Sequence, residues 1–600
     1  MLTLRSERRI LRLLCTLVVT SLTAVPVATA SDSPLTKLAA AKFRDLTRCE
    51  RAVLENADLK TTRHGPPVAC GPSSKLEDPS NDPKNAATWD HQRDLRAELI
   101  RWVFIDPDAN KQVDPEGIEA LGARITGSLD LGNAQVPFVL GCLHCAIPEP
   151  MTLQSAELKA LVLSGSDTNS IDGGGSHIHS GVYLDDGFKA SGQVSFGNSR
   201  IDSDFNCAGG SFTHSAKQGA EFWASERPAL FLGVARIQGP VWLTAGFKAD
   251  GAVDINGITC DGVFCSGGRF INPGNRAIFA WGANVSGPVI LAGSDPLGAI
   301  EATGLVQFDN ARIGGVIYAS GAKFLGAPSE AHGFSASAMT SGGAFIWQNV
   351  TLQDGATLDL RGSSVNGLID DETSWPAPGG LAIDGFVYRD FYGGPVDAAS
   401  RLKWVSLGAG QHPPWLVVAS GFHSQPYREL AKVLRDRGDD AGAARVLIAQ
   451  EDARYSQYGI PGRAAGGFIK WTIGYGHRPL LAIGWSLAVI LLGWGAVSMG
   501  ARAGVMAPTW PENKPPEARK SYEELHPLLY SLDVFLPFVN LHQEHYWWPD
   551  ATVTGECAVL GRDITIRGRA LRYYLWLQIV AGWLLSAIFI AGVTGLLRSD

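Results

Sequence analysis

The chain has 600 residues, a formal net charge of −8 and 69 glycines, so it is long enough for several domains with a large core. The charge is mildly acidic, and no basic stripe with interleaved aromatic residues occurs, which argues against a nucleic-acid partner. Most of the glycine lies in the middle of the chain and favours a structure with many tight corners.

Residues 1–30 have the three parts of a secretory signal peptide. A basic head that includes Arg5 and Arg8 precedes an apolar stretch at 13–19 and a small-x-small cleavage site, Ala-Thr-Ala, at 28–30. An uncleaved anchor helix is the alternative interpretation. Either one would send the following domain across a membrane.

Residues 31–121 are predicted to form a helical N-terminal cap for the repeat that follows, with an independent ligand-binding domain as the alternative. We expect helices at 35–59 and 91–105, the second because Leu95, Leu99 and Val103 have helical spacing. The end of a solenoid exposes unpaired backbone and apolar side chains, so it needs such a cover. A disulfide between Cys49 and Cys70 could tie the cap together.

Residues 122–370 repeat a sequence motif in which a small residue and a glycine precede a triplet of an apolar residue, any residue and a second apolar residue. The motif occurs at 125–131 (ITGSLDL), 237–243 (IQGPVWL), 285–291 (VSGPVIL) and 313–318 (IGGVIY). Such alternation places every second side chain on one face of a short strand. The intervening Gly, Asn, Asp and Ser residues allow tight corners between strands.

A longer echo joins GFKASGQVSF at 187–196 to GFKADGAVDI at 246–255. Self-similarity of this kind indicates a solenoid, and the scarcity of strong helix formers disfavours a helical one. We therefore predict a mainly β chain centred on a right-handed parallel β-helix with coils of roughly 20–25 residues. An antiparallel β-sandwich is the alternative, but hairpin turns flanked by long alternating runs are few.

Residues 371–425 are predicted to close the solenoid as a C-terminal cap, and residues 426–460 to form an αα-hairpin. The hairpin is expected because apolar residues recur at three- and four-residue spacing in 426–434 and 441–451, on either side of Gly438. We expect this hairpin to pack on the cap or on a membrane surface.

Two apolar runs, at 479–500 and 573–597, have the length of transmembrane helices. Basic residues are frequent near both ends of the loop between them, 501–570, and these are Arg502, Lys514, Arg519, Lys520, Arg562, Arg567, Arg569 and, just beyond it, Arg572. The positive-inside rule therefore places the loop in the cytoplasm. We expect an integral protein of the bacterial cytoplasmic membrane with its β-helix on the extracytoplasmic side.

Four segments carry a resemblance: ARITGSLDL at 123–131, PYRELA at 426–431, YSLDVFLP at 530–537 and GVTGLL at 592–597. They resemble bacterial membrane proteins that combine pentapeptide-like β-helix repeats with C-terminal membrane spans. Such proteins are often labelled "membrane-associated oxidoreductase", which implies a redox function. No Gly-x-Gly-x-x-Gly opens a helix after a predicted strand and no Cys-x-x-Cys-His haem site occurs, so no cofactor is predicted.

Cys142 and Cys145 form a Cys-x-x-Cys motif that could exchange thiols and disulfides, with His144 favouring the thiolate. Redox pairs of this kind usually lie at a helix N-terminus, whereas this one lies among predicted strands. A structural disulfide or two free thiols is therefore the preferred interpretation. No second pair has the spacing of a zinc site, and no metal site is predicted.

A glycan-cleaving β-helix would need carboxylates that converge in a cleft. The repeat carries carboxylates at positions that we expect to face solvent, namely Asp185, Asp186, Asp202, Asp204, Asp250 and Asp254. His177 and His179 have alternate-residue spacing and could seed a metal site, but we interpret them as a surface pair in a glycine-rich loop.

Two spans separated by YSLDVF at 530–535 invite comparison with two-span channels. The filter of such a channel uses backbone carbonyls of a loop like Thr-Val-Gly-Tyr-Gly, whereas FLPFVNL at 535–541 has no glycine. A channel would also need this loop outside the cell. We expect the loop to lie on the inner membrane surface, with Trp547 and Trp548 at the interface.

The sequence therefore predicts a membrane-anchored, non-enzymatic protein whose β-helix face binds an envelope polymer or protein, or acts as a scaffold. A membrane-associated thiol–disulfide oxidoreductase that uses Cys142 and Cys145 is the first alternative. A two-span channel-like protein is the second. No residue is assigned as catalytic.

Overall fold

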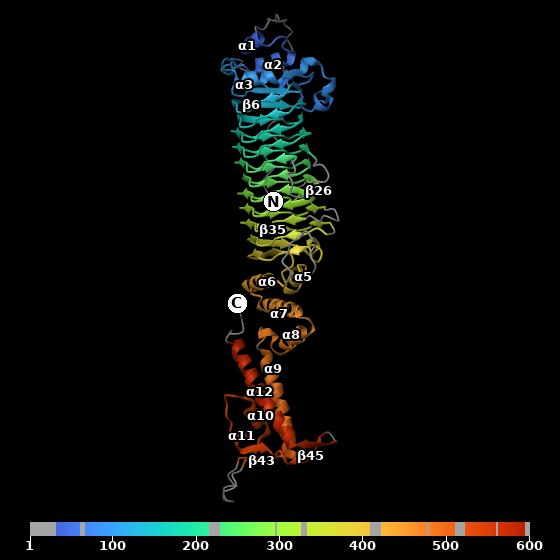
Figure 1. Cartoon of the computed structure of the whole chain (residues 1–600), viewed down its shortest axis with the longest axis vertical. Helices are drawn as coiled ribbons and strands as arrows, with labels where there is room; N and C mark the ends of the chain where they lie inside the picture. The colour runs from blue at the N-terminus through green and yellow to red at the C-terminus, as the bar shows by residue number, and fades with distance from the viewer. Residues whose placement is uncertain are drawn as a thin grey trace, which may run out of the picture.

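A computed structural model of the chain describes residues 32–60, 66–214, 228–293, 297–325, 333–353, 355–408, 422–476, 478, 480–509, 523–559 and 562–593. The predicted signal peptide at 1–30 lies outside these residues. Within them, short parallel strands form a long stack with helices at both of its ends, and a separate group of helices follows (Figure 1).

Strands of successive coils pair in parallel and form a 22-stranded and a 20-stranded sheet. The larger sheet begins with β1 (Val68–Ala69), β3 (Ile118–Leu121), β6 (Gln135–Leu143) and β9 (Glu157–Val162) and then divides into two ladders. The first ladder consists of β12 (His177–Ile178), β16 (Arg200–Ile201), β20 (Arg236–Ile237), β24 (Thr259–Cys260), β27 (Asn284–Val285), β30 (Arg312–Ile313), β34 (Thr340–Ser341), β38 (Ser364–Val365) and β41 (Val387–Tyr388). The second ladder consists of β13 (Val182–Tyr183), β17 (Phe205–Asn206), β21 (Val241–Trp242), β25 (Val263–Phe264), β28 (Val289–Ile290), β31 (Ile317–Tyr318), β35 (Ala344–Trp347), β39 (Gly367–Asp370) and β42 (Phe391–Gly393).

The smaller sheet also contains two ladders. The third ladder consists of β2 (Asp94–Arg96), β4 (Arg124–Thr126), β7 (Ala146–Ile147), β10 (Asp167–Thr168), β14 (Lys189–Ala190), β18 (Ser211–Thr213), β22 (Lys248–Asp250), β32 (Lys323–Phe324) and β36 (Thr351–Leu352). The fourth ladder consists of β5 (Leu129–Asp130), β8 (Met151–Thr152), β11 (Ile171–Asp172), β15 (Val194–Ser195), β19 (Leu230–Phe231), β23 (Val253–Asp254), β33 (Phe334–Ser335), β37 (Leu358–Asp359) and β40 (Leu381–Ala382). Two longer strands, β26 (Arg269–Phe279) and β29 (Glu301–Gln307), belong to both ladders.

Parallel pairing confirms the predicted β-solenoid and shows that the antiparallel sandwich is wrong. The two similar segments form equivalent strands. Residues 187–196 form β14 and β15, and residues 246–255 form β22 and β23, two coils further along the same ladders. The ladders extend beyond the expected limits of 122 and 370. They include β1, β2 and β3 before the predicted repeat, and β40, β41 and β42 where a closing cap was expected.

The interior of the third ladder alternates large and small side chains. Ala190, Phe212, Ala249 and Phe270 occupy one buried line, because their strands pair in that order. Phe247 fills the space in a coil that carries alanine on this line, and its ring centroid lies 5.4 Å from that of Phe212 and 5.3 Å from that of Phe270. Such alternation fills the narrow interior without overlap between neighbouring coils.

Helices and 3₁₀ turns lie at the N-terminal end of the stack, where Figure 1 labels α1, α2 and α3. They are α1 (Pro34–Lys42), α2 (Arg48–Ala57), α3 (Ala97–Ile105), α4 (Pro107–Asn110), η1 (Pro79–Asn81), η2 (Pro83–Thr88) and η3 (His91–Arg93). The single helix expected at 35–59 is wrong, because the chain turns between α1 and α2, where Asp45 has a φ of 53°. The helix expected at 91–105 begins only at Ala97, since the preceding residues pair with β4 as strand β2.

Helices continue the chain after the last coil (Figure 1). They are α5 (Ala398–Ser406), α6 (Gln425–Asp436), α7 (Asp440–Ser456) and α8 (Gly459–Ile473). α6 and α7 pack against each other as the expected αα-hairpin, whereas α8 had no counterpart among the predicted elements. The hydrophobic core of the solenoid continues through α5 and α6 into α7, where Val446 is fully buried.

Two helices, α9 (Leu480–Arg502) and α12 (Gly568–Val593), are long and apolar enough to cross a membrane. They overlap both predicted apolar runs. Between them lie α10 (Pro527–Phe535), α11 (Gln543–Tyr546), a two-stranded pair of β43 (Met506–Pro508) with β44 (Trp547–Pro549), and a hairpin of β45 (Thr554–Val559) with β46 (Arg562–Arg567).

Helix α10 packs beside the middle of α9 and α12. The Ser531 hydroxyl donates to the carbonyl oxygen of Ile490 at 2.7 Å, and the side-chain amide of Gln578 donates to the carbonyl oxygen of Ser531 at 2.9 Å. Gly493 leaves the space for this contact, because a Cβ there would lie 2.3 Å from the Ser531 hydroxyl oxygen. Helix α10 therefore packs against both apolar helices through polar contacts, while the expectation that the loop lies on the inner membrane surface stays a prediction.

Candidate functional site

The second ladder presents a line of apolar side chains on the outside of the solenoid. Strand alternation points the first residue of each short strand inward and the second outward, so Val241 is fully buried and Trp242 is partly exposed. We name the outward residues the apolar row, and they are Val162, Tyr183, Trp242, Phe264, Ile290, Tyr318, Ile346 and Ile369. Asn206 interrupts the row between Tyr183 and Trp242.

Members of the apolar row support one another across coils. The rings of Trp242 and Phe264 are stacked with their centroids 4.4 Å apart. The indole N–H of Trp242 donates to a carboxylate oxygen of Asp204 at 3.2 Å, which fixes the orientation of the ring. Tyr318 is 37% exposed. Because apolar patches on a soluble surface usually mark interaction sites, this row of partly exposed side chains is a candidate binding surface.

A strip of glycines precedes the apolar row in successive coils: Gly239, Gly262, Gly287, Gly315, Gly343 and Gly367. A Cβ on Gly262 would lie 2.8 Å from the Phe264 ring, so glycine is what lets this ring lie against the backbone. On the other side of the strip, the first ladder presents mainly polar groups, which we name the polar row: Arg200, Arg236, Thr259, Asn284, Arg312, Thr340 and Ser364. One face thus combines apolar contacts with hydrogen-bonding groups.

The apolar row is also visible in the sequence, at a position of the repeat that the sequence motif leaves unspecified. The row occupies the position described as "any" in the apolar, any, apolar triplet, as at Trp242 in 237–243 and Ile290 in 285–291. A water-facing strand position normally holds a polar residue. Repeated apolar residues at that position were therefore the sign of an exposed binding surface.

The acidic residues singled out in the repeat are divided between the two sheets. Asp185, Asp186, Asp202 and Asp204 follow strands of the larger sheet, whereas Asp250 and Asp254 belong to the smaller one. Local partners engage them: Asp185 accepts a hydrogen bond from the Ser164 hydroxyl at 2.5 Å, and Asp254 accepts one from the Asn256 side chain at 2.5 Å. Burial raises the pKa of both carboxyl groups.

Cys142 and Cys145 are free, fully buried thiols, so the disulfide considered for this pair is not formed. The Cys145 sulfur lies 3.3 Å from the backbone N–H of Ala123, which donates to it. A hydrogen bond with Cys145, together with burial, raises the pKa of Cys142 well above its ordinary value. The ring of His144 lies over Gly165 of the next coil. A buried thiol with a raised pKa holds little of the reactive thiolate, and this geometry does not favour thiol exchange.

Cys207, Cys260 and Cys265 are also free and buried, and Cys207 and Cys265 lie in the solenoid interior at the equivalent positions expected of them. Burial raises the pKa of the Cys265 thiol to about 12. These thiols act as small apolar groups that pack within the coils.

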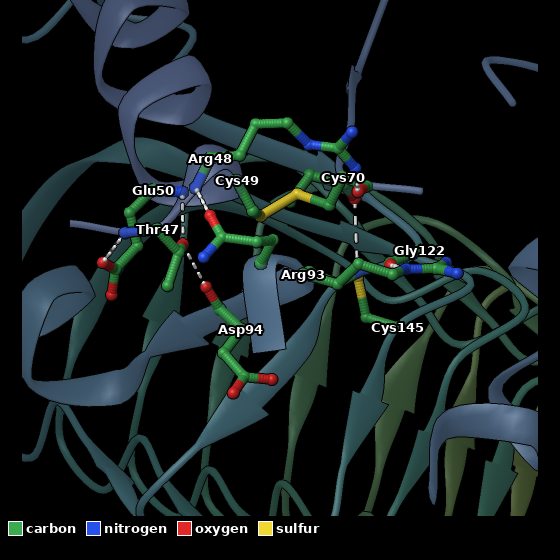
Figure 2. The surroundings of a disulfide bond; sticks show 12 residues. Thr47, Arg48, Cys49, Glu50, Cys70, Arg93, Asp94, Gly122 and Cys145 are labelled. Atoms are coloured by element: carbon green, nitrogen blue, oxygen red, sulfur yellow. Dashed lines mark hydrogen bonds between the residues drawn. A yellow bond between two sulfur atoms is a disulfide. The ribbon is translucent and has the colours of Figure 1, made fainter. Parts of the chain in front are cut away.

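Cys49 and Cys70 are joined by a disulfide, the pairing considered for the N-terminal region (Figure 2). Cys49 lies in α2, and Cys70 directly follows β1, the first strand of the larger sheet. Around the bond, the Arg48 guanidinium donates to the carbonyl oxygen of Cys70 at 2.7 Å, and that of Arg93 donates to the carbonyl oxygen of Gly122 at 2.9 Å (Figure 2). The disulfide therefore fastens α2 to the end of the stack.

Comparisons of the chain with protein-family models, with curated proteins and with solved structures find no match. The fold defines the class of protein: a parallel β-solenoid joined to two helices that are long and apolar enough to cross a membrane. Function has to be inferred from the surface of this chain alone.

Proposed function

We propose that this chain is a membrane-anchored envelope protein whose solenoid binds an extended glycan polymer along the apolar row. The row itself carries the proposal, because one outward position is apolar in coil after coil along the stack. Successive parallel strands lie about 4.8 Å apart, so the row offers regularly repeated contacts. Such a line of contacts suits a ligand that is itself long and repetitive.

The chemistry of the face favours a glycan over a globular protein. Sugar rings have apolar C–H faces and hydroxyl edges, and aromatic rings such as Trp242 and Phe264 cover the former at small entropic cost. The polar row supplies donors and acceptors for the latter, for example at Arg236 and Asn284. Protein–protein interfaces are centred on a broad apolar core, whereas the apolar residues here form a single line bordered by glycine and polar residues.

Two features support an extracytoplasmic solenoid. The hairpin of β45 and β46, which contains Arg562 and Arg567, lies at the end of the two apolar helices that is far from the solenoid (Figure 1). The positive-inside rule assigns that end to the cytoplasm. The disulfide of Cys49 with Cys70 is of a kind that forms and persists in oxidising compartments.

Sedimentation of the full-length, detergent-solubilised protein with insoluble peptidoglycan and with envelope polysaccharide tests glycan binding. The double variant Trp242→Ala/Tyr318→Ala should bind at least about tenfold more weakly, because buried aromatic anchors dominate binding energy. Trp281→Ala is the matched control, since Trp281 is 51% exposed but lies outside the apolar row. Equal retention of the wild type and the double variant, or no retention on any fraction, would contradict the proposal.

The disulfide provides a separate test of orientation. When cells are lysed in denaturant, Cys49 and Cys70 should react with an alkylating reagent only if a reductant is also added. The double variant Cys49→Ala/Cys70→Ala should lose about 3 kcal/mol of stability in the N-terminal coils, as expected for a loop of this size. Thiol-specific mass tagging followed by peptide mapping measures the first effect. Full alkylation of both cysteines without reductant would place the solenoid in a reducing compartment.

A further inference from the structure

Three side chains with metal-binding atoms meet outside the first coils of the larger sheet. Glu157 in β9 is the direct parallel-strand partner of His177 in β12, and His179 follows on the same outward side. One carboxylate oxygen and one nitrogen from each imidazole lie within 4.8 Å of one another. Ligand atoms that are each about 2.0–2.2 Å from a metal ion lie roughly 3–4 Å apart, so small side-chain rotations bring all three to bonding distance.

A second carboxylate, Asp202, contacts the imidazole of His177 and lies near that of His179. One oxygen of Asp202 lies 2.9 Å from His177 Nε2 and 3.7 Å from His179 Nδ1. Its other oxygen accepts hydrogen bonds from Arg200 Nε at 2.8 Å and Gln238 Nε2 at 3.0 Å. A carboxylate on the second ring nitrogen is the usual support of a metal-bound histidine.

We propose that Glu157, His177 and His179 bind a first-row divalent metal ion of the Zn²⁺ class and that Asp202 positions the histidines. Two imidazoles with a carboxylate suit such ions, whereas Ca²⁺ and Mg²⁺ prefer oxygen ligands alone. The side chains of Glu157, His177 and His179 are 44%, 34% and 43% exposed, so the ion keeps coordination positions open toward solvent. None of the three ligands belongs to the apolar row, although Arg200 of the polar row also contacts Asp202.

Equilibrium dialysis of the full-length protein against ZnCl₂ tests the site. The wild type should bind one Zn²⁺ per chain more than His177→Ala/His179→Ala, and excess Mg²⁺ should not displace it. His91→Ala changes an exposed histidine in η3 and should keep the wild-type stoichiometry. Asp202→Asn should keep the ion with about ten- to hundredfold weaker affinity, as for other supporting carboxylates.

Equal Zn²⁺ stoichiometry in the wild type and the folded double variant would overturn the proposal. If the double variant does not fold, the visible absorption of Co²⁺ added to the wild type and to Glu157→Gln decides. Histidine-bound Co²⁺ bands that are displaced by Zn²⁺ in the wild type and weakened in Glu157→Gln support the site. A wild-type spectrum equal to that of aqueous Co²⁺ overturns it.

Discussion

Replacing Arg401 with methionine should destabilise the C-terminal coils by about 3–5 kcal/mol, the usual cost of leaving one partner of a buried ion pair uncompensated. The Arg401 guanidinium donates to both carboxylate oxygens of Asp370, at 2.6 and 2.8 Å. The two side chains are 0% and 3% exposed. In the variant, Asp370 would keep the hydrogen bond from the Trp375 indole but lose its buried positive charge.

Arg437→Met is the matched control for the ion pair. Arg437 pairs with Asp390 at the same end of the stack, but both side chains are about one-third exposed, so this pair should contribute less than about 1 kcal/mol. Hydrogen exchange measured by mass spectrometry is the appropriate readout, because each coil of a solenoid is stabilised mainly by its neighbours. Similar losses of protection in both variants would contradict a special role for burial. The double variant Asp370→Leu/Arg401→Met should recover much of the loss, since it leaves no unpaired charge.

Replacing Phe247 with alanine should cost about 3–5 kcal/mol, because it removes a fully buried ring and leaves a cavity. Phe247 lies between the rings of Phe212 and Phe270, and the alternation of large and small residues leaves no neighbour able to fill its space. The loss should be concentrated in the coils that contain β18, β22 and β26. Urea unfolding would measure the loss of stability, and limited proteolysis with peptide mapping would show in which coils it occurs.

Two further variants distinguish the cost of the cavity from a nonspecific effect of substituting a residue in the repeat. Phe247→Leu keeps much of the buried volume and should cost less than about 1.5 kcal/mol. Phe279→Ala removes a ring that is only partly buried, on the outward side of β26, and should cost far less than Phe247→Ala. Equal destabilisation by Phe247→Leu and Phe247→Ala would show that the interior line is not closely packed.

Much of the fold followed from spacing along the chain. The period-two alternation in 237–243 and 285–291 predicted short strands, and the echo of 187–196 in 246–255 predicted coils, because every coil must solve the same packing problem. The apolar runs that became α9 and α12 were evident for the same local reason. The prediction of one helix over residues 35–59 was wrong, because no residue pattern distinguishes the turn at Asp45 from the helical segments on either side of it.

The candidate sites followed less directly. Cys49 and Cys70 were evident from the sequence as a possible disulfide pair. Whether Cys142 and Cys145 are reactive depended on the burial of both thiols, which only the structure shows. His177 and His179 were visible as a pair with no third ligand. Glu157 joined them only through the pairing of β9 with β12, which no motif in the chain records.

The sequence by itself determined the repeating coil, the apolar interior and the two apolar helices, because each depends on residues that are near one another along the chain. Only the tertiary structure decided which members of the apolar row lie side by side, how α10 packs beside α9 and α12, and which residues meet around His177. These depend on lateral neighbours, and the number of residues between neighbours varies from coil to coil, as it does from Trp242 to Phe264 and from Ile290 to Tyr318. Strand register sets such neighbours, and register is fixed by the packing of the whole stack.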